Sequence, residues 1–569
     1  MQMRSRKTAA LAAVALAVTT LSAGCSSSSG GSKGGSTTVA ALPIQNINAT
    51  PYADVKSGGT LRLAIPTFPA QFNFNQVNGQ TTAVSAIMSA LMPTPFIATG
   101  AGEPENDPAY VSSYKVVQAD PAAKVQQSVT LELNPKAVWS NGQPITAHDY
   151  IVQWDALNGS NAKFDPAGTT GFNDIGSVTQ GSSPYEVKYT FATPFGEWAS
   201  LFGIVFPAQY DATPSAFDNG FLNQIPVTGG PFKLGGISSS SQTVTVVRNP
   251  AFWWRPAKLD KVVFITLSQS AAVQALANNE IDNDEIFNVS QYDQVKSTPG
   301  VVARIASSAT WPDIIFNTKN SVLDNVKVRQ ALTMAVDRPA IITSQMKGLP
   351  VPAIQPLDNH ILLPTQLGYR DNSGQLGQYD TADAENLLSQ AGWVPGAGGV
   401  RYKDGKPMQL TIAIQSGDDI GSSVAQLVQQ MYAVVGFKVT IQTINANDYF
   451  DDYFDNGNFQ IAIFEWTDTP YTVSGAEAAY QSPQGGNVFQ NPGGIYEPKI
   501  DSLFTQALDT TDVTTSHAIA DQADALIWQE GHDIPLFAEP DIEMQKANLA
   551  NWGAWGLGLP DYTAIGFTS

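Results

Sequence analysis

The chain has 569 residues, of which 43% are apolar, with a formal net charge of −20 and a single cysteine. A surface this acidic repels nucleic acid and anionic lipid headgroups, so neither is expected to be a partner bound through charge. Because Cys25 is the single cysteine, the chain cannot form internal disulfides, and the folded part must be stabilised by packing. Metal sites built from several cysteines are excluded for the same reason.

The N-terminal segment has the pattern of a secretory signal. Basic residues at positions 4–7 precede an apolar run from Thr8 to Thr20, which is shorter than the ~20 residues needed to cross a bilayer. Residues 21–25 read Leu-Ser-Ala-Gly-Cys and resemble the bacterial lipobox. This resemblance implies that residues 1–24 are removed and that Cys25 receives a diacylglyceryl group. An unrelated cysteine at the end of an ordinary signal is the alternative.

Residues 25–57 are predicted to tether the folded part to the membrane, because positions 26–38 are rich in serine and glycine and such segments are flexible. The remainder is long enough for three to four domains of ~150 residues. Its first third is predicted to be rich in β-structure, because short apolar stretches alternate with turn-forming residues. The predicted strands are Gly59–Ile65, Ser128–Leu133, Glu186–Phe191, Thr243–Arg248 and Val262–Leu267.

Helices and strands alternate in the later part of the chain, which indicates a mixed α/β arrangement with some parallel pairing. Asp324, Asp337 and Asp380 are each predicted to begin a helix, the last ending at Gly392. A strand with Leu410, Ile412 and Ile414 on one face is followed by a helix to Gly436. The remaining predicted elements are strands Phe437–Thr443 and Phe459–Phe464 and amphipathic helices near Lys499–Leu508 and Thr514–Trp528. We find neither an internal repeat nor a second apolar segment of membrane length.

Several motifs follow one another along the chain. Residues 138–150 read Val-Trp-Ser-Asn-Gly-Gln-Pro-Ile-Thr-Ala-His-Asp-Tyr, which predicts a turn followed by a helix with Thr146 as N-cap and Asp149 as its reciprocal partner. His148 in that first turn is expected to be solvated. The adjacent glycines Gly229 and Gly230 before a proline suit a tight crossing of two segments. The other motifs are Thr228–Leu234, Arg248–Trp253, Ala277–Asp282, Phe316–Thr318 and Val326–Arg338.

Together, these motifs resemble family 5 of the extracellular solute-binding proteins of ABC transporters, the family that includes the oligopeptide- and dipeptide-binding lipoproteins, here of actinobacterial type. The resemblance implies an α/β, two-lobed periplasmic-binding-protein type II fold with mixed sheets and flanking helices, in which a solute is trapped between lobes joined by crossing strands. It implies three domains. The first is assembled from residues 58–75, 203–312 and 535–569, the second is 76–202 and the third is 313–534.

One further segment both matches the family and departs from it. Residues 465–470 read Glu-Trp-Thr-Asp-Thr-Pro, a shorter form of the stretch in which oligopeptide binders have a tryptophan and then an aspartate that neutralises the peptide amino group. Trp466 matches, whereas Asp468 is either this anchor or a turn residue before Pro470. Phe454 and Ile463 align with positions where some members have arginines for the ligand carboxylate. A free dipeptide is therefore disfavoured, because an unpaired carboxylate would be buried.

The resemblance suggests a set of ligand-lining residues. Asn78 and Gln80 follow the first strand, where the family contacts its ligand, and Trp311 precedes the third domain. For the aromatic residues other than Trp466, an ordinary place in the core is an equally good interpretation. The candidates for ligand binding are Trp466, Asp468, Asn78, Gln80, Trp311, Tyr480, Asn487 and Phe489.

Functions outside this family are less well supported by the sequence. No His-Glu-x-x-His motif indicates a hydrolase, although carboxylate pairs such as Asp451-Asp452 leave a glycosidase open. We therefore expect a monomeric binding protein, not an enzyme, with no cofactor and no metal. Its expected partners are a peptide ligand, ABC permease subunits with cytoplasmic ATPases, and the outer face of the cytoplasmic membrane through Cys25. A surface sensor, or a binder of oligosaccharides or metal chelates, is the alternative.

Overall fold

The computed structural model describes residues 42–120, 122–445, 448–454, 456–482 and 490–568. Cys25 and the predicted signal lie outside the described residues, as do Asn487 and Phe489. Residues 41–569 form one compact unit. Among the described residues, no helix combines the length and the apolar character needed to span a bilayer.

The first large sheet has seven strands in the order β12-β21-β11-β1-β10-β9-β8. β1 is parallel to β10 and β11, and the other pairs are antiparallel. The strands predicted at Gly59–Ile65, Thr243–Arg248 and Val262–Leu267 are confirmed to within one residue. The strands are β1 (Thr60–Ile65), β8 (Phe232–Ser238), β9 (Thr243–Arg248), β10 (Lys261–Thr266), β11 (Asn283–Glu285), β12 (Val301–Ser307) and β21 (Pro540–Lys546).

The second sheet has four antiparallel strands in the order β4-β5-β7-β6. The two strands predicted here from alternating apolar residues, β5 and β7, are confirmed. The strands are β4 (Val111–Val117), β5 (Ser128–Leu133), β6 (Ile175–Gln180) and β7 (Glu186–Phe191). The helices and short strands near it are α1 (Thr82–Leu91), β2 (Phe96–Ala98), β3 (Pro104–Asn106), α2 (Ala147–Leu157), η3 (Trp198–Phe202), α3 (Ala208–Asp211) and α4 (Pro214–Asn219).

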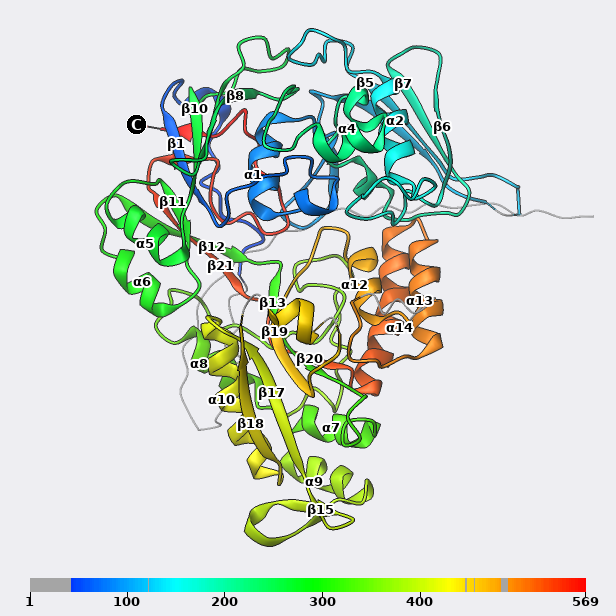
Figure 1. Cartoon of the computed structure of the whole chain (residues 1–569), viewed down its shortest axis with the longest axis vertical. Coiled ribbons are helices and arrows are strands. Elements are labelled where there is room, and N and C mark those ends of the chain that lie inside the picture. Colours follow the sequence, from blue (N-terminus) through cyan, green and yellow to red (C-terminus); the bar gives the residue numbers. More distant parts are fainter. Residues whose placement is uncertain (1–41, 121, 446–447, 455, 483–489, 569) are drawn as a thin grey trace, which may run out of the picture. The chain divides into compact units, whose positions relative to one another are not determined.

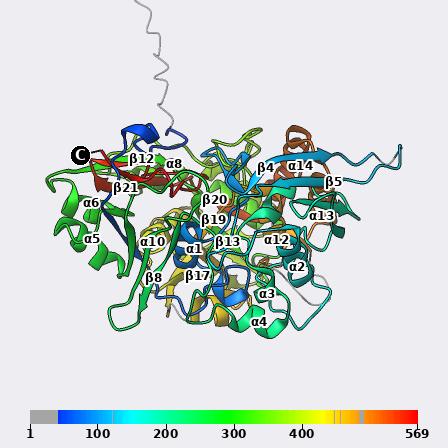
Figure 2. The ribbon, with the colours of Figure 1, turned by 90° about the horizontal axis from the view of Figure 1, so that it is seen from above.

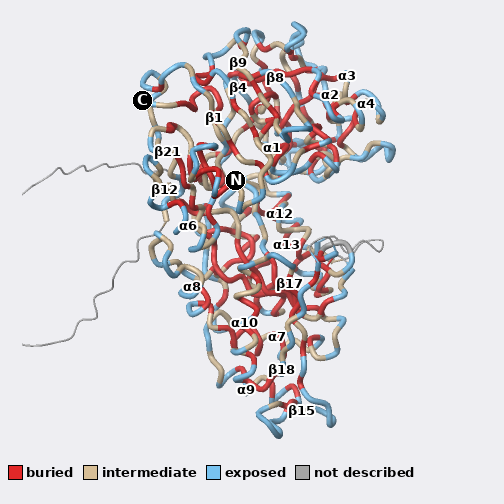
Figure 3. The backbone as a smooth tube through the Cα atoms, turned by 60° about the vertical axis from the view of Figure 1, so that its left-hand side comes forward, coloured by how far each residue is buried: buried red, intermediate tan, exposed pale blue. Residues whose placement is uncertain are grey.

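The third sheet has five strands in the order β18-β17-β19-β13-β20, with β17 parallel to both neighbours. Buried residues follow β17 and β19, whereas the hairpin around β15 is largely exposed (Figure 3). The predicted mixed α/β arrangement with parallel pairing is therefore confirmed. The strands are β13 (Thr310–Phe316), β17 (Gln409–Gln415), β18 (Lys438–Ile444), β19 (Ile461–Thr467) and β20 (Asp533–Pro535).

The helices of this later part begin at the predicted caps, with one correction. Asp337 and Asp380 cap α8 and α9 through their carboxylates. α7 is instead capped by Asn325, whose side chain accepts a hydrogen bond from the Lys327 amide, so the prediction of Asp324 was wrong by one residue. The helices are α7 (Val326–Met334), α8 (Arg338–Met346), α9 (Thr381–Gln390), α10 (Asp419–Val434), α12 (Thr472–Tyr480), α13 (Pro498–Leu508) and α14 (Val513–Glu530).

The remaining elements are short or lie at the edges of the sheets. α5 and α6 pack against each other beside β11 (Figures 1 and 2). Their bounds and those of the other elements are η1 (Tyr52–Asp54), η2 (Val77–Gly79), α5 (Gln269–Ala277), α6 (Val289–Val295), β14 (Val394–Pro395), η4 (Ala397–Gly399), β15 (Arg401–Lys403), β16 (Lys406–Pro407), η5 (Tyr449–Phe454), β22 (Leu549–Ala550) and β23 (Gly566–Phe567).

Two antiparallel chain segments, 301–316 and 533–546, connect the first sheet to the third. β12 pairs with β21 as far as Ser307 opposite Pro540, and β13 pairs with β20 from Asp313 opposite Pro535. Between the sheets, the Glu539 amide donates to the Thr310 carbonyl at 2.9 Å. Figure 1 shows β12 and β21 side by side and leading into β13 and β20. We call the first two sheets with their helices the first lobe, and the third sheet with its helices the second lobe.

The motif at residues 138–150 forms the predicted turn and the capped start of helix α2. Thr146 and Asp149 form the reciprocal capping box of α2, and His148 is exposed. A Cβ atom on Gly229 would lie 2.9 Å from the Trp139 ring, and one on Gly230 would lie 2.7 Å from the Ala90 carbonyl oxygen. The predicted tight crossing is therefore confirmed, because only glycine leaves room for these contacts.

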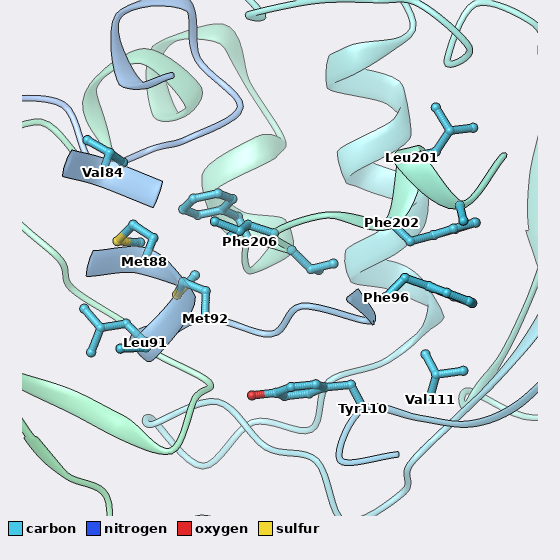
Figure 4. Packing of buried hydrophobic residues seen from close by; sticks show 14 of the residues in the cluster. Val84, Met88, Leu91, Met92, Phe96, Tyr110, Val111, Leu201, Phe202 and Phe206 are labelled. Carbon is cyan, nitrogen blue, oxygen red and sulfur yellow. The ribbon is translucent and has the colours of Figure 1, made fainter. Parts of the chain in front are cut away.

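The core of the first lobe is continuous between its two sheets. Met88 and Leu91 of α1 face the seven-stranded sheet, and Phe96, Phe202 and Phe206 extend the packing toward the four-stranded one (Figure 4). Phe202 is 1% exposed. Its ring centroid is 4.8 Å from that of Tyr189 and 5.5 Å from that of Phe96.

We predict that Phe202→Ala strongly destabilises the first lobe. The change removes a fully buried ring and its aromatic contacts and leaves a cavity, which costs about 3–5 kcal/mol in comparable sites. Denaturant unfolding followed by circular dichroism measures the effect. Leu222→Ala, at a residue that is 41% exposed, is the control and should change the free energy of unfolding by less than about 1 kcal/mol.

Candidate binding site

Two tryptophans lie opposite each other where the connecting segments enter the second lobe. Trp311 of β13 pairs in register with Trp466 of β19, and their ring centroids are 6.4 Å apart. Trp311 is buried, whereas Trp466 is half-buried and contacts three separate core clusters. Trp466 is therefore a residue at a junction of clusters, with part of its ring still accessible.

Each indole N–H of this pair donates to a carboxylate. Nε1 of Trp311 lies 3.2 Å from Oδ2 of Asp468, and Nε1 of Trp466 lies 3.1 Å from Oδ2 of Asp313. The backbone amide of Asp468 donates to the Ala309 carbonyl at 2.9 Å, which fixes this residue just beyond the end of β19. The strand register thus places two carboxylates beside the tryptophan pair.

Asp468 is a carboxylate without a cationic partner among the described residues. Burial raises its pKa to about 7, against a lowering by the Trp311 hydrogen bond. Among the described residues, no Lys, Arg or His nitrogen forms an ion pair with it. A positively charged group placed next to Asp468 would therefore be stabilised by the carboxylate and would favour its ionised form.

The other carboxylate, Asp313, belongs to a buried polar network. Asp313 is fully buried and lies beside Asp533 of β20. The hydroxyl of Tyr480 donates to Oδ2 of Asp533 at 2.9 Å. His360 lies between Asp533, at 3.4 Å from Nε2, and Asp524, at 2.7 Å from Nδ1. This chain of contacts links Trp466 through two aspartates to an imidazole.

The protonation of this network follows from burial and charge. Burial, and next the charge of Asp533, raise the pKa of Asp313 well above its usual range. Burial also opposes ionisation of Asp533, but the His360 charge together with the contacts to His532 and Asp313 outweighs it and lowers the pKa of that carboxyl. Burial disfavours the charged form of His360, yet Asp533 and Asp524 raise its pKa. The environment therefore favours the protonated form of Asp313 and the ionised form of Asp533.

The structure brings some of the predicted ligand residues together and not others. Trp311, Trp466 and Asp468 are neighbours, and Tyr480 is joined to them through Asp533, with a side chain that is buried. Asn78 and Gln80 are exposed on and just after η2. In the described part of the chain neither makes a hydrogen bond to the tryptophan pair. Asn487 and Phe489 lie outside the described residues.

Phe454 and Ile463, the two residues aligned with arginines of some family members, lie in the apolar core of the second lobe. Phe454 is 4% exposed and stacks on Phe459 with a centroid distance of 5.4 Å. Ile463 is fully buried in the core of the second lobe. Neither side chain carries a charge that could pair with a ligand carboxylate, and the prediction that a free dipeptide is disfavoured stays a prediction.

One cavity lies between the two lobes and was not predicted. It has a volume of about 570 Å³ and is lined by Glu197 and Trp198 from the first lobe and Gln366, Tyr471 and His517 from the second. Beside it, the Glu197 carboxylate accepts hydrogen bonds from the amides of Val473 and Ser474, at 3.0 and 2.9 Å. These amides begin α12, where a carboxylate is favoured by the helix dipole. No local sequence signal marks Glu197, because its partners come from a distant segment.

A second cavity, of about 540 Å³, opens at the carboxyl end of β1. Ile65, Thr82 and Trp552 line it together with Glu285 and Glu543. Sequence reasoning missed these acids because β11 and β21 are adjacent only in the folded sheet. In the described ranges, no group of histidine, cysteine, aspartate or glutamate residues has the arrangement of a metal site.

Comparison with known proteins shows which family this chain belongs to. Residues 117–487 match the bacterial extracellular solute-binding proteins, family 5 Middle. The chain is also 33% identical over 526 residues to the oligopeptide-binding protein OppA of Mycobacterium tuberculosis strain H37Rv, covering 92% of this chain and 87% of that protein. This chain belongs to family 5 of the extracellular solute-binding proteins. The predicted family is confirmed, and family 5 members are binding proteins, not enzymes.

Solved structures of this family confirm the predicted fold. A periplasmic EDTA-binding protein, EppA, superposes with a TM-score of 0.83 at 23% identity, covering 93% of this chain and 99% of that one. The oligopeptide-binding protein AppA from Bacillus subtilis, in complex with a nonapeptide, gives a TM-score of 0.72 at 18% identity, covering 90% and 99%. Their identities are low, so these structures establish the periplasmic-binding-protein fold alone.

We predict that Asp313→Asn changes how stability depends on pH. A carboxyl whose pKa is raised by folding stabilises the folded state at low pH, and this contribution is lost as pH rises above its ordinary value of about 3.9. The asparagine variant lacks this titration but also loses the acceptor for Trp466. Its melting temperature should be below that of the wild type at pH 4, and the difference should shrink toward pH 8.

Differential scanning calorimetry at constant ionic strength measures this difference. Asp54→Asn, at an exposed position, is the control and should follow the wild type at every pH. A melting-temperature difference for Asp313→Asn that is constant from pH 4 to pH 8 would contradict the assignment of a raised pKa.

Proposed function

We propose that this family 5 protein is a lipid-anchored extracytoplasmic binding protein that captures peptides, mainly oligopeptides, between its lobes and delivers them to an ABC importer. The observation that carries the proposal is the 33% identity to an oligopeptide-binding protein across 92% of the chain. Relatedness of this extent includes both lobes and the connecting segments.

The ligand would lie against the tryptophan pair and be enclosed by both lobes. Closure around an extended peptide allows hydrogen bonds along the peptide backbone, in the manner of strand addition, so that side chains are read loosely. The lining residues that we propose are Trp466, Asp468, Asn78, Gln80, Trp311, Tyr480, Asn487 and Phe489. The interlobe cavity of about 570 Å³ provides additional volume next to Tyr471.

Asp468 is proposed to anchor the peptide amino group. Its carboxylate has one neutral donor, Trp311, and no described cationic partner, so an α-ammonium group would complete its hydrogen bonding. The apolar residues at positions 454 and 463 leave no arginine for the peptide carboxylate there. Longer or modified peptides, whose carboxylate reaches solvent or is absent, are therefore favoured over free dipeptides.

The proposed domains follow the membership of the sheets. The seven-stranded sheet uses segments that correspond to 58–75, 203–312 and 535–569, the four-stranded sheet belongs to 76–202, and the five-stranded sheet belongs largely to 313–534. The chain would be monomeric and located at the outer face of the cytoplasmic membrane, attached through a diacylglyceryl group on Cys25. Its protein partners would be the permease subunits and their ATPases, with a surface sensor as the alternative role.

We predict that Trp466→Ala weakens peptide binding at least roughly tenfold, because a half-buried aromatic residue in a binding cleft supplies a large share of the contact energy. The melting temperature of the empty protein should fall by only a few degrees. Mass spectrometry of co-purified compounds identifies a ligand, and calorimetry with that compound measures its affinity.

Trp254→Ala is the matched control, because Trp254 is 45% exposed on the first lobe and distant in sequence from the proposed lining. It should leave the affinity unchanged. An unchanged affinity in the Trp466 variant would remove this residue from the site, and co-purification of only non-peptide compounds would contradict the proposed ligand class.

We predict that Cys25→Ser abolishes lipid attachment. The serine hydroxyl cannot form the thioether that joins the diacylglyceryl group to the cysteine sulfur. Wild-type protein expressed in a bacterial host should incorporate radiolabelled palmitate and partition into detergent, whereas the variant should do neither. Equal labelling of both proteins would show that the anchor, if present, is elsewhere.

A further inference from the structure

A row of acids occupies one face of β21 and the residue before it. Glu539, Asp541 and Glu543 alternate along the chain with apolar residues, two of which, Ile542 and Met544, are buried in the core beneath α5. Since side chains alternate between the faces of a strand, the three acids project from the face opposite that core. The seven-stranded sheet thus carries an acidic strip at the point where the chain leaves for the second lobe.

Three more carboxylates extend this strip toward the second lobe. Glu285 of β11 lies directly opposite Glu543 in the antiparallel register. Glu465 of β19 and Asp418, the N-cap of α10, both act electrostatically on the carboxyl of Glu539. We call this set the acidic wall; its members are Glu285, Asp418, Glu465, Glu539, Asp541 and Glu543.

No cation in the described ranges neutralises the acidic wall through an ion pair. Among the described residues, no Lys, Arg or His nitrogen forms an ion pair with any of its members. Arg304 lies opposite Glu543 in the β12–β21 register, yet it makes no ion pair with Glu543, and its Nε has no hydrogen-bond partner. Within the wall, only the hydrogen bond between the carboxyls of Glu539 and Glu465 relieves the repulsion between like charges, and no described cation adds to it.

Glu539 shows that the wall is arranged for a partner from outside. Only 8% of this residue is exposed, and its Oε1 has no hydrogen-bond partner. Burial and next the Glu465 charge raise the pKa of its carboxyl well above the usual range. The side chain lines a crevice between the lobes with Phe287 and Ile420. Buried polar atoms without a partner are rare in native structures and mark sites with a function.

The wall also borders a cavity large enough for a side chain. Glu285 and Glu543 line the cavity of about 540 Å³ at the carboxyl end of β1. The Asn283 amide donates to Oε2 of Glu543 at 2.7 Å, which holds that carboxylate in place. Apolar surface from Ile65 and Trp552 completes the lining. A long aliphatic side chain that ends in a positive charge matches this combination of apolar and acidic surface.

We propose that the acidic wall binds the basic side chains of the peptide, so that the solute is a cationic peptide carrying lysine or arginine. This inference rests on the proposed function and names its substrate class. An ammonium or guanidinium group donates several charge-assisted hydrogen bonds at once and converts the protonated carboxyls to their ionised form. The net charge of −20 adds long-range attraction for such a peptide.

The experiment compares synthetic pentapeptides that differ only in charge. Each has an alanine and glycine background with two lysines or arginines, two glutamines, or two glutamates. The full-length mature protein is freed of co-purified solute by partial unfolding and refolding, and binding is measured by calorimetry. We expect the basic peptides to bind at least roughly tenfold more tightly than the glutamine peptides, which corresponds to 1.4 kcal/mol, and the glutamate peptides to bind most weakly.

Substitutions then assign the effect to the wall. Glu465→Gln and Glu285→Gln are at exposed positions, so folding is retained, and Glu539→Gln replaces the buried member by a group of the same shape. Each should weaken binding of the basic peptides roughly tenfold and leave the glutamine peptides unaffected. Glu132→Gln, at an exposed residue of β5, is the matched control and should change neither. If Glu539→Gln does not fold, the Glu465 and Glu285 variants decide.

The outcomes separate this inference from the proposed function. Equal affinity for the basic and glutamine peptides, or equal losses for both in the variants, would overturn the cationic ligand while leaving peptide binding intact. Failure of every pentapeptide to bind would overturn the proposed function itself. Spermidine is included as a cation that is not a peptide. Binding of spermidine as tight as that of the basic peptides would overturn the assignment to peptide side chains.

Discussion

The arrangement of this protein depends on the backbone pairing of two segments, 301–316 and 533–546, that pass together from one sheet to another. Each segment is a strand in both sheets, and the hydrogen bonds between them continue across the junction. Two paired strands can bend and twist but cannot easily separate, so they join the lobes and still permit relative motion. Trp311 and Asp313 follow the junction on one segment, and Glu539 and Asp541 flank it on the other.

Two clusters of buried carboxyl groups lie near this junction, the Asp313 network and the acidic wall. Burial disfavours charge in both, but their neighbouring groups differ. In the network of Asp313, Asp533 and His360, the two aspartates beside the imidazole raise its pKa, and its positive charge lowers the pKa of Asp533. The acidic wall has no ion pair with a described cation; the carboxyls of Glu539 and Glu465 share a hydrogen bond, and Oε1 of Glu539 has no partner. The Asp313 network accepts the hydrogen bond of the Trp466 indole. The acidic wall would be stabilised by a positive group of the ligand.

A further contact between the lobes is made by a side-chain cap and not by paired strands. The Glu197 carboxylate caps α12 of the second lobe with two hydrogen bonds, and a cavity of about 570 Å³ adjoins this contact. A cap of this kind is local and weak compared with the burial of a core. It therefore stabilises one relative arrangement of the lobes without fixing it permanently, as a protein that encloses and releases a solute requires.

Elements whose signals are short-range could be predicted from the sequence alone. Alternating apolar residues located β5, β7 and β9, and side-chain caps located α8 and α9, because strand periodicity and helix capping act over a few residues. Motifs such as that around Trp139 identified the family. The predicted N-cap of α7, Asp324, was wrong by one residue, because the neighbouring Asn325 is also a good N-cap and occupies that position. The contact of Glu539 with Glu465, the cap that Glu197 gives α12 and the hydrogen bond of Tyr480 to Asp533 became visible only in the folded protein. These pairs come from segments far apart in the chain, and strand register and burial, which no local pattern encodes, bring them together.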